Sequence, residues 1–342
     1  MSYDGFEVDM LSVGDGDAIV ATQWTAGIAT RVLIDGGNVD AVNTVRSFLL
    51  GRGITYLDHV ICSHPHDDHA AGLLQLVNDR RFKFGRLWMH LPWNHVDTSV
   101  TMRAWRHGQA QRVVKILIAS LENQVKLAKV AAERGIPMDK EPFTGERIGP
   151  LFVCGPSRGF YKALLMEFTD MEKLLAFESD LEKEARQDFI EDVFAEAGRS
   201  EPESGLLEEP HTECENNSST IMWAKCSDET FVFTSDAGVP ALERARTDYR
   251  IGGCYWMQVP HHGSRRNITQ GLINYFSPSL AYVSAAGNRK HPRRAVVNAF
   301  KERHCQVFST YYPRATHMWI SRGTVPLRPG YRPLTRIYEA QT

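Results

Sequence analysis

Short apolar runs separated by turns rich in glycine and aspartate occur near both ends of the chain. Residues 6–13 alternate apolar and polar side chains as a half-buried strand does, and 18–22 and 31–34 are further strand-like runs. Helical spacing follows over 39–51, and 58–63 is again a short apolar run. This alternation of strands and helices predicts an α/β fold.

The C-terminal half returns to strand-like patterns. Residues 220–224 and 230–234 predict a hairpin that ends at Asp236, because two β-rich runs are joined by a short polar turn. Further strands are predicted at 255–260, 280–284, 306–310 and 317–321. Between the two strand-rich parts, helical spacing predicts a helix or helix pair within 93–135 and an acidic helical block and loop at 160–210.

The composition excludes several classes of protein. Apolar residues make up 43% and charged residues 23%, which excludes a collagen-like or wholly disordered chain. The longest apolar stretch, 113–118, is far shorter than the about 20 residues of a membrane span, and no signal-peptide pattern opens the chain. The 6 cysteines include no C-x-x-C pair, which is typical of reduced thiols. We therefore expect a cytoplasmic protein with no membrane association.

Charge is distributed unevenly along the chain. Residues 167–209 hold 15 acidic and 4 basic side chains, whereas residues 241–342 hold 16 basic and 4 acidic ones. The basic C-terminal third favours an anionic substrate, although basic surfaces are often merely solvated.

The densest chemistry lies in the segment His64-Pro65-His66-Asp67-Asp68-His69. In an extended loop, residues i and i+2 point to the same side, so His64 and His66 can share one metal ion. Asp68 and His69 lie where the chain turns into a helix and can face a second ion. Imidazole and carboxylate together suit Zn²⁺, with Mn²⁺ and Fe²⁺ as alternatives. The competing interpretations are a histidine-rich surface turn and a histidine whose hydrogen bonds are satisfied within the core.

Further candidate ligands follow later strands. Asp236 comes after the apolar run 231–235, and His261 and His262 come after 258–260. Because the ends of several strands meet at one edge of a sheet, we expect these residues and the histidine-rich segment to form one set.

This set resembles the metallo-β-lactamase superfamily, through His-x-His-x-Asp-His, a downstream strand-end Asp and a later His. Flanking motifs are similar to the metallo-β-lactamase domain of ComEC-type competence proteins, and they lie at 13–18, 34–37, 216–219, 259–264 and 284–292. The similarity runs from about residue 8 to residue 320. ComEC-type proteins are membrane proteins, whereas this chain shows no span, so a DNA-uptake pore is not supported.

The resemblance implies an αβ/βα four-layer sandwich in a single domain, 1–342, with 93–135 and 160–210 as helical insertions. It also implies that two divalent metal ions bind at one edge of the sandwich. Zn²⁺ is the expected ion, and Mn²⁺ is the alternative. The implied metal ligands are His64, His66, Asp68, His69, Asp236 and His262.

The resemblance leaves some of these roles open. Adjacent residues at a strand end point apart, so we expect one of His261 and His262 to face the metal and the other the substrate. We take His262 as the ligand. The further ligand of the first ion is unassigned, with His211, Asn217 and water as the alternatives.

Catalytic and substrate-binding roles follow from the same resemblance. Asp68, Asp236 and His261 are the implied catalytic residues, with His261 on a phosphate or leaving-group oxygen. Substrate-binding candidates are Asn217, Ser264, His291, Arg289 and Lys290. Turn capping by Asn and Ser, and a solvated helix start for the basic residues, are the competing interpretations.

The function that these features favour is hydrolysis of phosphodiesters by a dimetal enzyme, most simply a nuclease acting on DNA or RNA. The ComEC-type branch is associated with DNA degradation. Alternatives are hydrolysis of a small phosphoester, nucleotide or (thio)ester, or a catalytic subunit of a larger complex. In the last case the acidic block 160–210 would dock a protein partner.

Overall fold

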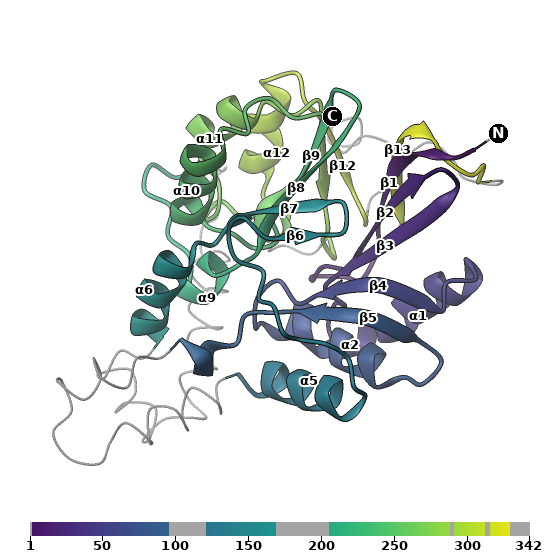
Figure 1. Ribbon diagram of the computed structural model, residues 1–342. Coiled ribbons are helices and arrows are strands. Elements are labelled where there is room, and N and C mark those ends of the chain that lie inside the picture. Colours follow the sequence, from purple (N-terminus) through teal and green to yellow (C-terminus); the bar gives the residue numbers. More distant parts are fainter. Residues whose placement is uncertain (1, 96–120, 169–204, 288–290, 312–314, 329–342) are drawn as a thin grey trace, which may run out of the picture.

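The computed structural model describes residues 2–95, 121–168, 205–287, 291–311 and 315–328. Within these residues the strands form a six-stranded and a seven-stranded sheet, with helices on their outer sides (Figure 1). Apolar side chains fill the space between the two sheets and the space between each sheet and its helices. This arrangement confirms the predicted four-layer α/β sandwich.

The first sheet has the order β13-β1-β2-β3-β4-β5. Its strands are β1 (Asp4–Met10), β2 (Ile19–Thr25), β3 (Ile28–Ile34), β4 (Tyr56–Ile61), β5 (Lys83–Trp88) and β13 (Met318–Thr324). The strands from β13 to β3 run antiparallel to their neighbours, whereas β3, β4 and β5 are parallel. The carboxyl ends of β3 and β4 therefore lie side by side.

The second sheet has the order β12-β11-β10-β9-β8-β7-β6. Its strands are β6 (Arg147–Ile148), β7 (Leu151–Gly155), β8 (Ile221–Cys226), β9 (Glu229–Phe233), β10 (Trp256–Gln258), β11 (Leu280–Val283) and β12 (Gln306–Ser309). The strands from β9 to β12 are parallel, so β9, β10 and β11 end at a common edge.

The alternating sequence of strand β1 places apolar side chains on one face of the strand and acidic side chains on the other. Phe6 points between the sheets, where its ring meets Phe231 of β9 edge to face with centroids 5.0 Å apart. Glu7 and Asp9 lie on the opposite face, are buried, and both accept hydrogen bonds from Arg328. The alternation read from the sequence thus separates an apolar core from a buried ion-pair network.

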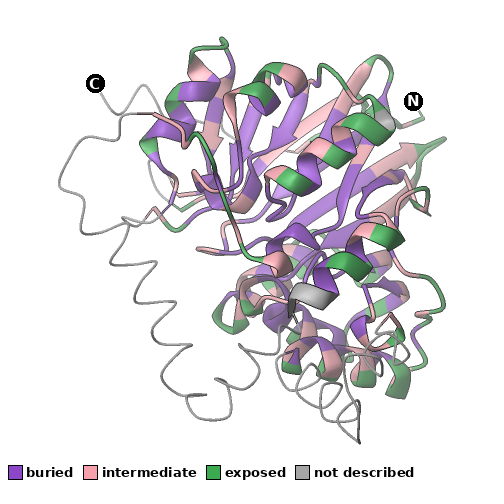
Figure 2. Ribbon diagram, turned by 90° about the vertical axis from the view of Figure 1, so that its left-hand side faces the viewer, coloured by how far each residue is buried: buried purple, intermediate pink, exposed green. Residues whose placement is uncertain are grey.

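Helices cover the outer face of each sheet. The helices α1 (Val42–Gly51), α2 (Asp67–Asn78) and α5 (Glu122–Glu133) contribute to the core of the first sheet. The helices α10 (Val239–Tyr249), α11 (Gln270–Phe276) and α12 (Arg294–Lys301) do so for the second. Figure 2 shows the buried strands at the centre and exposed residues on the outer sides of helices.

Part of each predicted insertion is described, and the described helix of the first one, α5, belongs to the helix layer over the first sheet. In the first insertion, α5 packs on α2, and Asn123 donates a hydrogen bond to Asp67. In the second, α6 (Arg158–Phe168) and residues 205–210 are described. Residues 96–120 and 169–204, which carry most of the predicted insertion helices, lie outside the described residues. Among the helices that are described, none combines the length and apolar character needed to cross a bilayer.

Candidate metal centre

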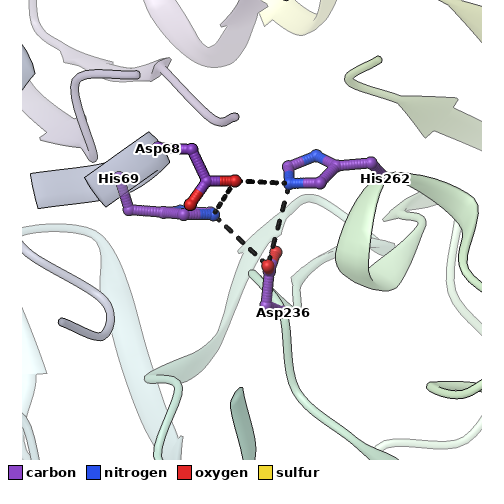
Figure 3. A group of neighbouring side chains, drawn as sticks. All are labelled: Asp68, His69, Asp236 and His262. Carbon is purple, nitrogen blue, oxygen red and sulfur yellow. Dashed lines mark ion pairs between the residues drawn. The ribbon is translucent and has the colours of Figure 1, made fainter. Parts of the chain in front are cut away.

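The predicted ligands meet where the carboxyl ends of strands from both sheets approach each other. His64 follows β4, Asp236 follows β9, and His262 lies in the turn η3 (Pro260–Gly263) after β10. Asp68 and His69 occupy the first turn of α2. Figure 3 shows Asp68, His69, Asp236 and His262 pointing toward one another from these separate elements.

Close backbone contact holds the start of α2 at this edge. Gly36 donates a hydrogen bond to the His69 carbonyl at 3.0 Å, and Gly72 donates one to the Gly37 carbonyl at 2.8 Å. A Cβ atom built on Gly72 would lie 2.1 Å from the Gly36 oxygen. Because these residues are glycines, the backbone of α2 can contact the loop after β3 directly. This contact fixes the position of Asp68 and His69 relative to the strand ends.

The first group of potential donors comprises Asp68, His69, Asp236 and His262, one atom from each lying within 4.8 Å of all the others. The Nε2 atom of His69 is 3.4 Å from Asp236 Oδ2, and His262 Nε2 is 3.4 Å from Asp68 Oδ2. Two imidazoles and two carboxylates at these separations suit a divalent transition metal ion.

The second group comprises His64, His66 and Asp236. His64 Nε2 lies 3.8 Å from Asp236 Oδ2, and the rings of His64 and His66 have centroids 4.8 Å apart. Asp236 belongs to both groups, so its carboxylate lies where a residue shared by two ions would be. The pairing of His64 with His66, and of Asp68 with His69, is the one that the sequence predicts.

Asp35 orients one histidine of each group. Its Oδ2 atom is 2.9 Å from His69 Nδ1 and accepts a hydrogen bond from Ser63 Oγ at 2.6 Å. Since Ser63 Oγ donates to Asp35, it accepts from the nearby Nδ1 of His64, 3.0 Å away. Both rings therefore carry Nδ1–H and turn Nε2 toward the centre, as metal-binding histidines do.

His262 is held in the same way by a backbone carbonyl, since its Nδ1 atom lies 3.0 Å from the oxygen of Ser284. The atoms that face the centre are buried and have no hydrogen-bond partner among the described residues. They are Nε2 of His64, His69 and His262, and both carboxylate oxygens of Asp236. Buried polar atoms of this kind are normally satisfied, and cations bound by the two groups would satisfy all of them. The residues present therefore fit divalent ions.

The pKa values of the residues in the centre are shifted by burial and by the charges of their neighbours. Burial alone would raise the pKa of Asp236, which is 1% exposed, but the rings of His69, His261 and His262 hold that pKa well below its usual value. Burial would lower the pKa of His262, but Asp236 and Asp68 raise it to about 9. Burial and the adjacent His69 ring lower the pKa of His64 well below its usual value, which keeps its Nε2 lone pair available.

The adjacent histidines do not point apart as expected. Both have left-handed backbone angles, with φ of 47° at His261 and 53° at His262. Their Nε2 atoms consequently approach the same oxygen of Asp236, at 3.6 Å and 3.7 Å. His262 is 3% exposed and belongs to a donor group, whereas His261 belongs to none among the described residues and its side chain is 19% exposed.

The predicted substrate-binding residues have mixed positions. Ser264 Oγ accepts a hydrogen bond from the backbone N–H of Arg266, and Asn217 Nδ2 donates one to the Glu213 carbonyl, so both cap local turns. His291 is buried, with its ring centroid 5.5 Å from that of His261. The predicted Arg289 and Lys290 lie outside the described residues.

Sequence reasoning gave no role to three acidic residues at the centre. Asp17 and Asp35 form a further donor group with His69, and Asp17 accepts a hydrogen bond from Gln258 at 2.6 Å. Glu213 forms one with His66 and Glu215. The Asp35-Gly36-Gly37 turn after a predicted strand was a signal for Asp35. His211 is exposed and is in none of the donor groups of the described residues.

Comparisons with known proteins give both solved structures and a family model that this chain is similar to. Among solved structures, the chain is similar to the metallo-β-lactamase fold protein YhfI from Bacillus subtilis, with 10% identity, a TM-score of 0.42 and coverage of 93% of this chain and 100% of that one. It is also similar to a diphosphatase from the PhnP family, with 10% identity, a TM-score of 0.39 and coverage of 93% and 98%.

For the hydrolase AbOPH of the β-lactamase superfamily, identity is 13%, the TM-score is 0.33, and the match covers 64% of this chain and 55% of that one. No curated protein matches the chain. The family model described as the metallo-beta-lactamase superfamily matches residues 29–287, which is most of the sequence. By that match the chain belongs to the metallo-β-lactamase superfamily.

Proposed function

We propose that this protein is a metal-dependent phosphodiesterase and that nucleic acids are its main substrates. Superfamily membership supports metal-dependent hydrolysis. The observation that carries the dimetal part of the proposal is the position of Asp236, which belongs to two donor groups and has two buried oxygens without hydrogen-bond partners among the described residues.

The residues assigned to the ions follow from the two groups. His64 and His66 would hold one ion, Asp68, His69 and His262 would hold the other, and Asp236 would be shared. When bound, a pair of Zn²⁺ or Mn²⁺ ions would lower the pKa of a water molecule and neutralise charge on a phosphoryl oxygen.

His261 is the residue that we assign to proton transfer. Asn267 Nδ2 donates to the Asp236 carbonyl at 2.8 Å, which turns Asn267 Oδ1 toward His261 Nδ1 at 2.9 Å. The Nδ1 atom of His261 therefore carries the proton, and Nε2 carries the lone pair. Burial lowers the pKa of His261, so the ring is neutral and its Nε2 can take up a proton and return it to a leaving oxygen.

An anionic substrate is favoured by the basic residues beside the centre. Arg265 and Arg266 follow the turn that carries His261 and His262, and the backbone N–H of Arg293 donates to the Gly263 carbonyl. Arginine is suited to phosphate because its planar guanidinium offers paired donors. Together with the charge of the C-terminal third, this supports a nucleic-acid backbone over a neutral ester.

The finer resemblance to the ComEC-type branch belongs to the same proposal. Two of its five motifs, 216–219 and 259–264, border the centre. Thr220, directly after the first, donates to the Ser63 carbonyl next to His64, and the second contains His262. Docking of a protein partner through 160–210 stays a prediction, because 169–204 lie outside the described residues.

The test is hydrolysis of single- and double-stranded DNA, RNA and a chromogenic phosphodiester by the metal-loaded protein, with a thioester and a lactone as competing substrates. We expect nucleic acid and the chromogenic ester to be cleaved. His64→Ala and Asp236→Asn should abolish turnover and lower the number of bound ions. His261→Gln should lower kcat about 100-fold or more while both ions stay bound.

Three results would contradict parts of this proposal. Turnover by His64→Ala and Asp236→Asn at the wild-type rate would remove the assigned centre. Cleavage of the thioester or lactone alone would remove the phosphodiester assignment. Loss of metal from His261→Gln would show that His261 is a ligand and not a proton carrier.

A further inference from the structure

The two donor groups that share Asp236 are unequal. The group with His262 has four members, two imidazoles and two carboxylates, whereas the group with His64 and His66 has three. Zinc and similar ions usually take four ligands, so the second group lacks one relative to the first.

Glu213 lies next to the smaller group. Its Oε2 atom is 3.3 Å from Nε2 of His66, and it belongs with His66 and Glu215 to a donor group of its own. Two ligands about 2.0–2.2 Å from one ion at a tetrahedral angle are about 3.4 Å apart, which matches this separation. The neighbouring Glu215 differs from Glu213 in that its Oε2 atom accepts a hydrogen bond from Cys214 Sγ at 3.2 Å.

The backbone around Glu213 is attached to the sheet edge that carries the candidate metal ligands, whereas the Glu213 side chain can rotate about its own bonds. Glu213 is the residue before the short helix α9 (Cys214–Asn217), and Thr220 beyond that helix donates to the Ser63 carbonyl at 3.1 Å. The Glu213 side chain is 54% exposed, so rotation about its own bonds can bring the carboxylate inward.

The smaller group itself points to a ligand. Nε2 of His64 and both oxygens of Asp236 are buried, face the group, and have no hydrogen-bond partner among the residues that the structure describes. We propose that Glu213 is the closing side-chain ligand of the metal site formed by His64, His66 and Asp236. This inference rests on the proposed dimetal centre.

With Glu213 as a ligand, the two metal sites have the same types of ligand. Each then has two imidazoles and two carboxylates, with Asp236 in common. A carboxylate in place of a further imidazole adds a negative charge and a harder oxygen donor, which shifts the preference of the site with His64 and His66 toward Mn²⁺. The third carboxylate also offsets more of the charge that two divalent ions bring.

The test is a calorimetric titration of the metal-free protein with Mn²⁺ and, separately, with Zn²⁺. In Glu213→Gln, which keeps the shape of the side chain, we expect one of the two ions to bind at least tenfold more weakly and the other to bind as in the wild type. Glu208→Gln is the matched control, because Glu208 is exposed on the same segment and is in none of the described donor groups. Its binding should be unchanged.

A second variant tests the chemistry of the ligand. Glu213→His should again bind two ions, with the ratio of Zn²⁺ to Mn²⁺ affinity at the weakened site raised at least tenfold over the wild type. The thermal midpoint of the metal-free protein should be the same in all these variants, because the Glu213 side chain is largely exposed.

Wild-type affinity for both ions in Glu213→Gln would overturn the inference and leave the dimetal centre intact. Loss of one ion in Glu215→Gln, with Glu213→Gln unaffected, would also overturn it. If the wild-type protein bound no divalent ion at all, the proposed function would fail together with this inference.

Discussion

At the scale of single residues, Asp35 connects both halves of the candidate centre. One carboxylate contacts Nδ1 of His69 directly and reaches His64 through the hydroxyl of Ser63. The backbone N–H of Ser63 also donates to Asp35, at 2.8 Å, so each carboxylate oxygen accepts at least one hydrogen bond. Asp35 therefore positions one ring of each donor group without facing either ion.

Replacing Asp35 by Asn should weaken binding of both ions by 10- to 100-fold, because a single amide oxygen cannot replace both carboxylate oxygens. Asn tolerates the left-handed backbone at this position, where φ is 58°, so the fold should persist. Calorimetric titration with Zn²⁺ measures the effect. Asp40→Asn, at an exposed position in the short 3-10 turn Val39–Ala41 that follows the loop of Asp35, is the control. Equal affinities in the two variants would show that Asp35 has no positioning role.

The buried ring of His90 should make the free energy of unfolding depend on pH. Burial lowers the pKa of His90 to about 3, because its ring lies between Phe143 and Tyr161 with centroids 4.7 Å and 4.6 Å away. In the unfolded chain this ring takes up a proton below about pH 6.5. The folded state does not, so the contribution of His90 is present above that pH and is lost as the pH falls toward 3.

We therefore expect the metal-free wild type to lose about 1.4 kcal/mol of unfolding free energy per pH unit, relative to His90→Gln, between about pH 6 and pH 4. Urea unfolding at several pH values measures this. His304→Asn, which removes an exposed histidine, should leave the slope unchanged. Parallel slopes for the wild type and His90→Gln would contradict the prediction.

The sequence predicts the site residues that lie close together in a local pattern. It does not predict those that join the site only through tertiary contacts. The spacing within 64–69 shows which histidines and aspartates share a side of the loop. Nothing local relates Asp35 or Glu213 to those rings, because they meet across different elements. Asp67 and Asp68 are alike in sequence, and they are separated in the structure because Asp67 bonds Asn123 of α5 while Asp68 faces His262.

At the scale of elements, the contact between α2 and the loop after β3 positions the centre. Gly72 of α2 lies against the backbone of Gly36 and Gly37, where a Cβ atom would come within 2.1 Å and 2.7 Å of their oxygens. Only backbone atoms meet there, so a larger side chain must displace the helix. Such a displacement would carry Asp68 and His69 with it.

Gly72→Ala should consequently lower the unfolding free energy by about 1–3 kcal/mol and weaken metal binding, although Gly72 is no ligand. Gly159→Ala in α6 is the matched control, since a Cβ atom there meets nothing within 4 Å. It should be neutral or slightly stabilising. Urea unfolding and metal titration of both variants provide the comparison, and equal stability of the two would show that the close contact is not needed.

The elements that could be predicted are those with a clear period. The strand-like runs correspond to β1, β2, β3, β4, the hairpin β8–β9 and β10 to β13, and the predicted helix at 39–51 begins as a short 3-10 turn, Val39–Ala41. Strands β5 and β7 and helices α10 to α12 were not predicted. In β5 a Gly and charged residues interrupt the pattern, and its partners become visible only when the sheet is assembled.

At the scale of the whole molecule, the candidate centre joins the two sheets. Ligands from the first sheet and α2 face ligands that follow β9 and β10 of the second sheet. Metal ions bound there would connect parts of the chain that are far apart in sequence. The resemblance to a known family supplied this pairing of strand ends, because periodicity alone does not tell which ends meet.

Removal of metal should therefore lower global stability. Binding of ions to the folded state alone, at a concentration 100 times the Kd, adds about 2.7 kcal/mol to the unfolding free energy. Thermal unfolding with excess chelator should show a lower midpoint than with excess Zn²⁺, and His262→Ala should show a smaller difference. A midpoint that does not respond to chelator in the wild type would exclude such a connection.

The most direct test of the dimetal centre is the number of divalent ions per chain, measured by elemental analysis after gel filtration of the metal-loaded protein. The wild type should retain two ions, and Asp236→Asn should retain one or none because it loses the shared carboxylate. A wild type without bound ions, or an Asp236→Asn variant that still holds two, would contradict the account.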